Sequence, residues 1–252
     1  MMQSLDIFSP IWIFAFLAVL LAAFIRGLAG FGLALILAPI LLLILNPVAV
    51  VVINIFLGLL SNIVVVIHSF GQIDYKRVLP MALSSLLGIP LGVWIISVVA
   101  TNILKILIGV IIIFFAILVA SGFRKIFSNE RLSSSISGFF SGILSSSTSL
   151  GGPPVVLFMH SQKWPKELIH PSLAVYFLFL GCCSLGALSV SGQVSADTVI
   201  SAASLAPALV VGTGLGMVVF HRVKARFFRA LSVAIVICAG VLGVISGLGL
   251  LP

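Results

Sequence analysis

Charged residues are scarce in this chain. They make up 7% of its 252 residues, whereas hydrophobic residues make up 62%. An ordinary soluble domain is about 25% charged, because its exterior needs polar cover. The scarcity of charge excludes a soluble enzyme and a disordered chain, and it indicates an all-α polytopic membrane protein. At about 20 residues for each spanning helix, the chain has room for about seven to nine crossings.

Acidic residues and cysteines are few as well. Five Asp and Glu oppose 13 Lys and Arg, which gives a net charge of +8. An excess of Lys and Arg is typical of the cytoplasmic loops of membrane proteins, and no nucleic-acid-binding motif accompanies it. The three cysteines lie in apolar runs without metal-ligand spacing, and the chain lacks HExxH and GxSxG motifs. We therefore expect no nucleic acid partner, no metal, no cofactor and no enzymatic activity.

The apolar runs fall into two similar series. The first run, at 11–45, is too long for one crossing and is interrupted by the glycine-rich segment 26–32. In the second half, the run at 134–160 is interrupted by the Ser, Gly and Pro residues of 145–154. Glycine and proline are the strongest local helix breakers. The remaining predicted spans are 47–69, 78–99 and 103–121, followed by 171–190, 198–220 and 227–250.

Short matches recur in the same order in both halves. Pro39 and Pro154 follow the two interruptions, Gly71-Gln72-Ile73 resembles Gly192-Gln193-Val194, and two glycines four residues apart recur at 88–92 and 212–216. These matches predict an internal duplication. The first repeat covers 1–121, a cytoplasmic linker covers 122–133, and the second repeat covers 134–252. Each repeat is expected to hold a broken or re-entrant helical hairpin plus three transmembrane helices.

The distribution of basic residues predicts the topology. The linkers at 71–77, 122–133, 161–170 and 221–229 hold all of the Lys and Arg except Arg26 and Lys105. The positive-inside rule places these four basic loops in the cytoplasm. The run between 134 and 160 then begins and ends on the same side, so we expect it to be re-entrant. Because matching loops face opposite sides, the two repeats are expected to have inverted topology. That plan recurs in secondary transporters with broken helices.

Two motifs carry a resemblance to a known family. Gly30-Phe31-Gly32 with the later Pro39, and the segment from Ser149 to Val156, SLGGPPVV, resemble the TauE/SafE family over essentially the whole chain. Its members are called sulfite or organosulfur-compound exporters, or simply probable membrane transporters. The resemblance implies anion transport across a bacterial inner membrane. We therefore expect a secondary transporter that exports small anions such as sulfite or organosulfonates.

The substrate is expected near the midplane, between the two helix breaks. Half-helix N-termini offer unpaired N–H groups and a positive dipole end to an anion. Arg26 adds charge, and hydroxyl, amide and glycine residues add donors and close backbone approach. The candidate substrate-binding residues are Arg26, Gly27, Gly30, Gly32, Asn54, Asn62, Ser147, Thr148, Ser149, Gly151, Gly152 and Pro153.

Each candidate group also has a structural interpretation. Arg26 can reach the headgroups with its long side chain, Asn54 and Asn62 can join helices through hydrogen bonds, and the serines can satisfy the backbone at the bend. The alternative functions are transport of another organic anion, ion-coupled import, or a non-transporting scaffold. The expected partners are the lipid bilayer, a small anion and a second copy in a homodimer. Since no acidic residue falls within a predicted span, we expect efflux driven by the membrane potential rather than by carboxylate-based proton symport.

Overall fold

The protein is a bundle of α-helices. The computed structural model describes residues 9–29, 32–69, 73–121, 129–162 and 164–220, and also 237, 240, 241 and 244–248. Every regular element within these ranges is helical. Five helices are long and apolar enough to cross a membrane, which confirms the prediction of an all-α polytopic membrane protein. The predicted span at 227–250 lies largely outside the described residues, as do the basic residues of 221–229.

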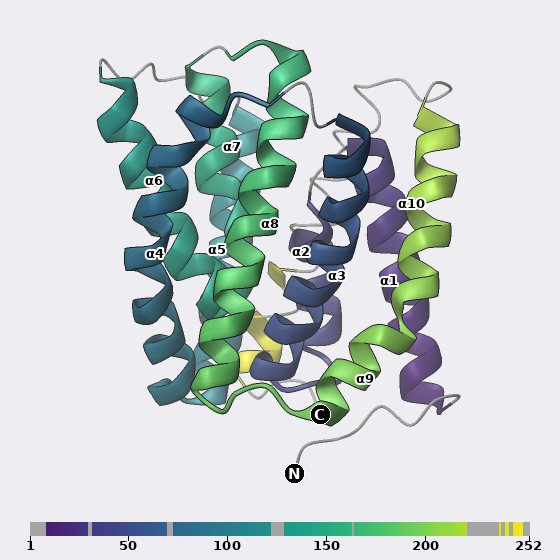
Figure 1. Cartoon of the computed structure of the whole chain (residues 1–252). Coiled ribbons are helices and arrows are strands. Elements are labelled where there is room, and N and C mark those ends of the chain that lie inside the picture. The colour runs from purple at the N-terminus through teal and green to yellow at the C-terminus, as the bar shows by residue number, and fades with distance from the viewer. Residues whose placement is uncertain are drawn as a thin grey trace.

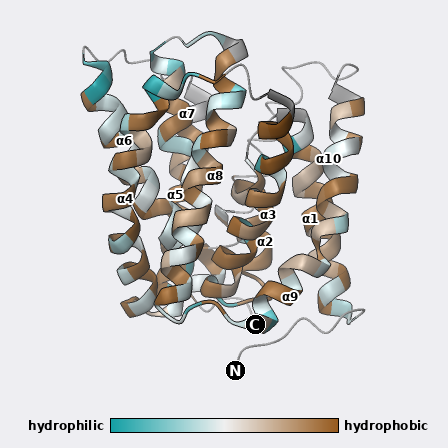
Figure 2. Ribbon diagram, viewed as in Figure 1, coloured by the Kyte–Doolittle hydropathy of each residue, from teal (hydrophilic) through white to brown (hydrophobic). Residues whose placement is uncertain are grey.

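The helices follow the predicted apolar runs closely. They are α1 (Pro10–Ala29), α2 (Leu33–Leu41), α3 (Pro47–Ser69), α4 (Tyr75–Val98), α5 (Thr101–Ser121), α6 (Glu130–Thr148), α7 (Gly152–Ser161), α8 (Lys166–Val190), α9 (Ala196–Ser204) and α10 (Ala206–Phe220). In Figure 1, α3 and α8 lie between a group that contains α4 and α6 and a pair formed by α1 and α10. Hydrophobic residues run along the middle of the helices, and the more hydrophilic residues lie mainly toward their ends (Figure 2).

Both predicted breaks are present, and each contains a residue in the left-handed backbone region. Gly32, which precedes α2, has φ 95°, and Ser149, which follows α6, has φ 60°. The α2 and α7 helices have 9 and 10 residues, or about 14–15 Å at 1.5 Å per residue. Neither can cross a core of about 30 Å. The α6 helix begins, and α7 ends, at the same end of the molecule (Figure 1).

The predicted span over 198–220 is present as the candidate membrane span Ala196–Val218, but a turn divides it. The structure has two helices there, α9 and α10, which meet at Leu205. Pro207 explains the interruption, because proline has no N–H to donate to the carbonyl four residues earlier and its ring crowds that carbonyl. The backbone tightens just before it, where the Leu205 N–H donates to the Ala202 carbonyl at 3.2 Å.

The broken helices pack closely on spans of the other half. On α6, a Cβ added at Gly138 or Gly142 would collide with the backbone of α4 at Met81 or Ser85. On α10, a Cβ added at Gly216 would collide with the backbone of α1 at Phe24 and Gly27. Small residues allow such backbone contact between membrane helices. The glycines therefore fix the pairs α4–α6 and α1–α10.

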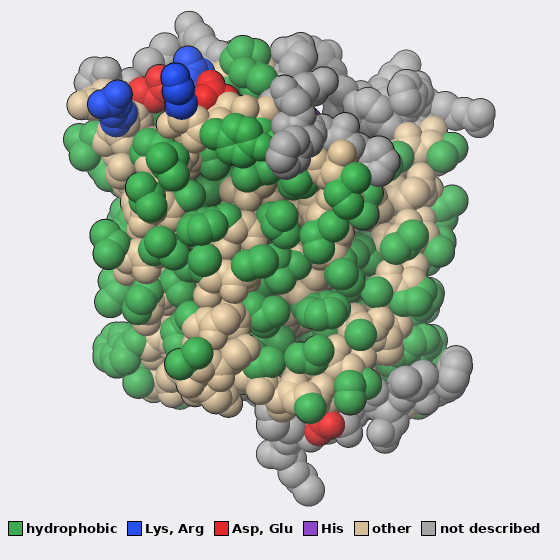
Figure 3. All heavy atoms as spheres, viewed as in Figure 1, with side chains coloured by type: hydrophobic (Ala, Val, Ile, Leu, Met, Phe, Trp, Pro, Cys, Tyr) green, Lys and Arg blue, Asp and Glu red, His purple; other side chains and the backbone are tan. Residues whose placement is uncertain are grey.

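A polar cluster joins three segments at one end of the bundle. Asp74 caps α4 by accepting a hydrogen bond from the Arg77 N–H at 3.2 Å. The Arg77 guanidinium lies 3.5 Å from Asp74 and 3.6 Å from Glu130 of α6. Trp164, just before α8, donates to Glu130 at 3.2 Å. Figure 3 shows charged side chains gathered at this end and hydrophobic side chains over the middle of the same face.

Candidate functional site

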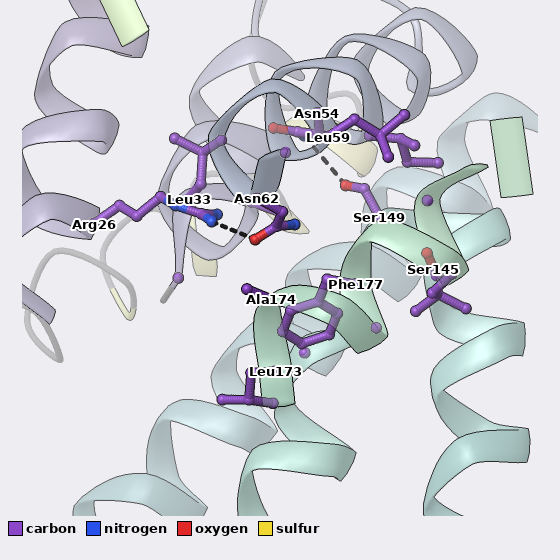
Figure 4. A pocket seen from close by; sticks show the side chains of 18 of the residues that line it. Arg26, Leu33, Asn54, Leu59, Asn62, Ser145, Ser149, Leu173, Ala174 and Phe177 are labelled. Atoms are coloured by element: carbon purple, nitrogen blue, oxygen red, sulfur yellow. Dashed lines mark hydrogen bonds between the residues drawn. The ribbon is translucent and has the colours of Figure 1, made fainter. Parts of the chain in front are cut away.

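A cavity of about 310 Å³ lies between the two helix breaks. Its walls come from the last turn of α1, the start of α2, one face of α3, the α6–α7 break and one face of α8, with Met217 of α10. Figure 4 shows α1 and α3 supplying Arg26, Asn54 and Asn62, and the second half supplying Ser145, Ser149 and Phe177. The cavity thus combines residues of both halves of the chain.

The cavity is elongated along α3 and α8. On α3 its lining extends from Asn54 to Val65, and on α8 from His170 to Gly181. Each stretch covers twelve residues, or about 16 Å of helix from the first to the last. The two helices run in opposite directions (Figure 1), so Asn62 and Val65 lie at the same end as His170. Asn54 lies at the other end, near Gly181.

Arg26 places a positive charge at the first of these ends. Its Nη2 donates a hydrogen bond to Asn62 Oδ1 at 2.7 Å, and its side chain is partly buried. Among the described residues, both ion pairs are formed by Arg77, and Arg26 has no carboxylate partner. A guanidinium has five N–H donors. The bond to Asn62 therefore holds the side chain in place and leaves donors for a further acceptor.

Asn54 and Ser149 form a second polar contact, eight positions lower on α3. Asn54 Nδ2 donates to Ser149 Oγ at 3.2 Å, and Ser149 Oγ donates to the Thr148 carbonyl at 2.6 Å. Because Ser149 uses its single proton on that carbonyl, it must accept from the Asn54 NH₂ group. This requirement fixes the orientation of the Asn54 amide. Asn54 Oδ1 is buried and has no hydrogen-bond partner among the described residues.

Most hydroxyls of the second break bond to their own helix. Ser147 Oγ donates to the Ile143 carbonyl at 2.6 Å, and Thr148 Oγ1 donates to the Leu144 carbonyl at 2.7 Å. Ser146 Oγ donates to Gly142 in the same way and also reaches the Ile89 carbonyl of α4. The accepting carbonyls lie within α6 and α4, so these bonds satisfy the hydroxyls themselves. The carbonyls at the bend are reached by two other serines, since Ser149 donates to the Thr148 carbonyl and Ser141 donates to the Gly151 carbonyl.

The predicted substrate-binding residues divide into three groups. The cavity is lined by Arg26, Gly32, Asn54, Asn62, Ser149, Gly151, Gly152 and Pro153. Gly27 instead packs against α10, and Ser147 and Thr148 face backbone carbonyls of α6. Gly30 lies outside the described residues.

The sequence analysis missed several lining residues. His170 was assigned to the linker 161–170, but α8 begins at Lys166 and His170 lines the cavity. Pro171 gave the false boundary, because proline usually stands near a helix start, and here it lies within α8. The apolar wall formed by Leu59, Leu173 and Phe177 carries no sequence signal that separates it from lipid-facing residues.

The arrangement suits a small anion. The described residues that line the cavity include Arg26 and His170 and contain no Asp or Glu. Hydrogen bonds from ionised groups such as guanidinium are stronger than those between neutral groups. Among the described residues, no group of three or more His, Cys, Asp and Glu is placed to hold a metal ion.

A multi-pass helical protein whose broken helices surround a cavity lined in part by polar side chains has the architecture of a secondary transporter. The comparisons found no match among curated proteins or among solved structures. The sequence model described as sulfite exporter TauE/SafE matches residues 15–243, nearly the whole chain. The chain belongs to the TauE/SafE sulfite exporter family, which is a family of membrane transporters.

Proposed function

We propose that this protein exports small sulfur-containing anions, such as sulfite or organosulfonates, across the bacterial inner membrane. The substrate occupies the cavity between the two helix breaks. The observation that carries the proposal is the position of Arg26, a cation in an intramembrane cavity with no carboxylate partner among the described residues. Intramembrane ionisable residues are costly and mark substrate pathways.

Arg26 is suited to oxyanions by its shape as well as its charge. The planar guanidinium binds two oxygens of one group at once, whereas an ammonium acts as a point charge. Its bond to Asn62 holds this plane at the cavity wall. An anion there restores the charge balance of the cavity, and this supports binding of sulfite or a sulfonate group.

The second break contributes neutral donors. Gly151, which caps α7, and Gly152 line the cavity, and the α7 N-terminus has no side-chain cap. The first N–H groups of a helix lack intrahelical partners and favour anions. Because Pro153 and Pro154 have no N–H, the donors at the start of α7 are the N–H groups of Gly151 and Gly152. An added Cβ at Gly151 would come within 2.9 Å of Ser141 O and Ser145 Cβ, so only glycine fits there without displacement.

The paired contacts support two inverted repeats, one within 1–121 and the other within 134–252. The α6 helix packs on α4 of the first repeat, and α1 packs on α10 of the second. The glycine pairs at 88–92 and 212–216 make the corresponding contacts. In each case a helix of one repeat packs on a helix of the other repeat. The cavity between the repeats can then open alternately to one side of the membrane and to the other.

The outward direction of transport is supported by the negative charge of the substrate and by the charges of the cavity lining. Among the described residues that line the cavity there is no Asp or Glu, so that lining offers no carboxylate to carry a proton. A membrane potential that is negative inside is worth about 2.3 kcal/mol per charge per 100 mV, and it drives an anion outward. The positive-inside rule supports a cytoplasmic position for the starts of α4 and α6, which carry Lys76, Arg77 and Arg131.

Flux measurements on purified protein in liposomes test the proposal. Vesicles are loaded with sulfite, thiosulfate, methanesulfonate or a small carboxylate, and a potassium gradient with valinomycin sets the potential. We expect sulfur anions to leave faster than carboxylate, and to leave faster when the inside is negative. Arg26→Gln is expected to reduce this flux at least about tenfold, whereas Lys105→Gln, on α5 outside the cavity, retains it.

Three results would contradict parts of the proposal. Absence of flux for every anion would remove the transport function. Equal flux with the potential at zero, but only with an inward proton gradient, would replace potential-driven export with proton coupling. Wild-type flux in a well-inserted Arg26→Gln variant would assign Arg26 to headgroup contact.

A further inference from the structure

His170 lies at the Arg26 end of the cavity, on the opposite wall. Arg26 comes from the last turn of α1, and His170 is the fifth residue of α8. Both side chains line the cavity. His170 is exposed enough to reach a ligand. One end of the cavity therefore holds two basic side chains from the two halves of the chain.

The other described residues that line the cavity at this end carry no titratable side chain. The lining residues of α3 there are Asn62 and Val65, and α10 contributes Met217. The lining residues of α2 and α7, such as Leu33 and Gly152, carry no titratable side chain either. Arg26 is thus the charged group that faces His170 among the described lining residues. The side chain of His68, on α3, lies outside those described. Outside the lining, α4 also packs on α8: the Asp74 N–H donates to Ser172 Oγ at 3.4 Å, and the Asp74 carboxylate lies 3.5 Å from Arg77.

We propose that His170 is a second anion-binding residue and that it binds in its protonated form, so that anion and proton bind together. The proposal rests on the proposed function, because it concerns the same cavity and the same class of anion. It extends that function by naming a titratable specificity residue on the wall opposite Arg26.

The charge balance of the cavity supplies the reason. Histidine is the side chain whose charge ordinarily changes between pH 5 and 8. In the empty cavity a protonated His170 would face the fixed charge of Arg26, and like charges oppose ionisation. A bound anion compensates the positive charges of both Arg26 and protonated His170. Each ligand then favours the other by the same factor, as reciprocal coupling requires.

This coupling has a consequence for selectivity. With His170 protonated, the cavity end carries two positive charges and suits a dianion such as thiosulfate. With His170 neutral, it carries one and suits a monoanion such as methanesulfonate. We therefore expect the preference for thiosulfate over methanesulfonate to grow as pH falls, although neither probe changes its own charge in this range.

Equilibrium binding of thiosulfate to purified full-length protein between pH 5.5 and 8.5 tests the proposal. We expect the wild-type affinity to be about 5- to 150-fold higher at the acidic end, the usual range of coupling between two ligands. His170→Gln should be independent of pH and bind as weakly as wild type at pH 8.5. His170→Arg, with a fixed charge, should be independent of pH and bind as tightly as wild type at pH 5.5.

Two further variants identify the titrating group. His160→Gln, on α7 and outside the cavity lining, should keep the wild-type pH profile. If His68→Gln removes the pH dependence and His170→Gln retains it, the proposal is overturned. A wild-type protein that transports anions with no pH dependence of binding also overturns it, while leaving the proposed function intact. A wild-type protein that neither binds nor transports any tested anion overturns the proposed function itself.

Discussion

The two helix breaks occupy matching places in the chain but differ in chemistry. The first brings a charge, Arg26, and turns at Gly32, which has no side chain to offer. The second brings a run of hydroxyls and turns at Ser149, whose side chain holds Asn54. One break therefore supplies the electrostatic attraction for an anion, and the other supplies shape and neutral donors.

The difference extends to how each break satisfies its backbone. In the second break, the Ser149 hydroxyl donates to the Thr148 carbonyl and the Ser141 hydroxyl donates to the Gly151 carbonyl. In the first, the described residues offer no hydroxyl, and Arg26 bonds to α3 instead. A break whose polar groups are satisfied internally is rigid without a ligand. A break that exposes a cation without a counter-charge is stabilised when an anion binds. We therefore expect substitutions in the first break and in the second break to have very different effects.

The largest effect is expected where the helices that carry the breaks pack on their partners. Gly216→Val places a side chain against the backbone of Phe24 and Gly27 on α1. Overpacking costs about 1–3 kcal/mol or more, so we expect little folded protein in the membrane. Gly142→Val should have the same effect on the α4–α6 pair, where the obstacle is the Ser85 backbone.

Gly214→Val is the matched control, because an added Cβ at Gly214 meets nothing within 4 Å. It shares the helix and the β-branched side chain of Gly216→Val but lacks the collision. Membrane yield and the elution profile in detergent measure the outcome. Equal yields of the two variants would show that α1 and α10 are not in the contact described.

The next largest effect concerns the charge of the first break. Arg26→Gln keeps a hydrogen-bonding side chain and removes the cation. Loss of a charged partner costs about 1.5–3 kcal/mol, which corresponds to about 10- to 150-fold in anion affinity. Isothermal titration with thiosulfate measures it, with Lys105→Gln as a charge-matched control whose side chain instead contacts Ser246. A loss of affinity in Lys105→Gln as large as in Arg26→Gln would indicate a general effect of net charge.

The sequence predicted the spans and the breaks because their signals are local. Apolar runs of 20 residues and the clusters around Gly32 and Ser149 depend on neighbouring residues alone. The turn at Leu205 was not predicted, although Pro207 marks it, because no charged residue interrupts the apolar run across it. The placement of His170 was missed because it depends on which face of α8 turns toward α1.

The candidate site was predictable to a smaller extent. Eight of the twelve predicted residues line one cavity, yet their contact with a substrate stays a prediction. Ser147 and Ser149 are two positions apart in one hydroxyl run, but one bonds to its own helix and the other to Asn54. The backbone reversal at Ser149 separates their directions, and composition does not encode that reversal.

A smaller effect compares the two left-handed positions directly. Ser149→Gly should remove backbone strain, because glycine adopts positive φ freely, while it loses the bond to Asn54. Ser149→Ala loses the same bond and keeps the strain, so it should be less stable than Ser149→Gly by about 1 kcal/mol. Gly32→Ala introduces that strain at the first break, where φ is 95°. Thermal unfolding in detergent orders the variants, and greater stability of Ser149→Ala than of Ser149→Gly would contradict the turn geometry.

The smallest effect is expected at Ser147, which the sequence analysis included among the substrate-binding residues. Its hydroxyl donates to the Ile143 carbonyl at 2.6 Å, and that carbonyl also lies within the regular hydrogen-bond ladder of α6. Alanine is the best helix former and leaves no donor without a partner, so Ser147→Ala should change anion affinity by less than about twofold, below the about 0.5–1.5 kcal/mol of a typical hydrogen bond. Comparison of the anion affinities of Ser147→Ala and Arg26→Gln separates the contribution of the charge in the first break from that of the hydroxyls in the second. A loss in Ser147→Ala as large as that in Arg26→Gln would mean that the hydroxyl leaves its helix to bind the anion, and the two breaks would then contribute alike.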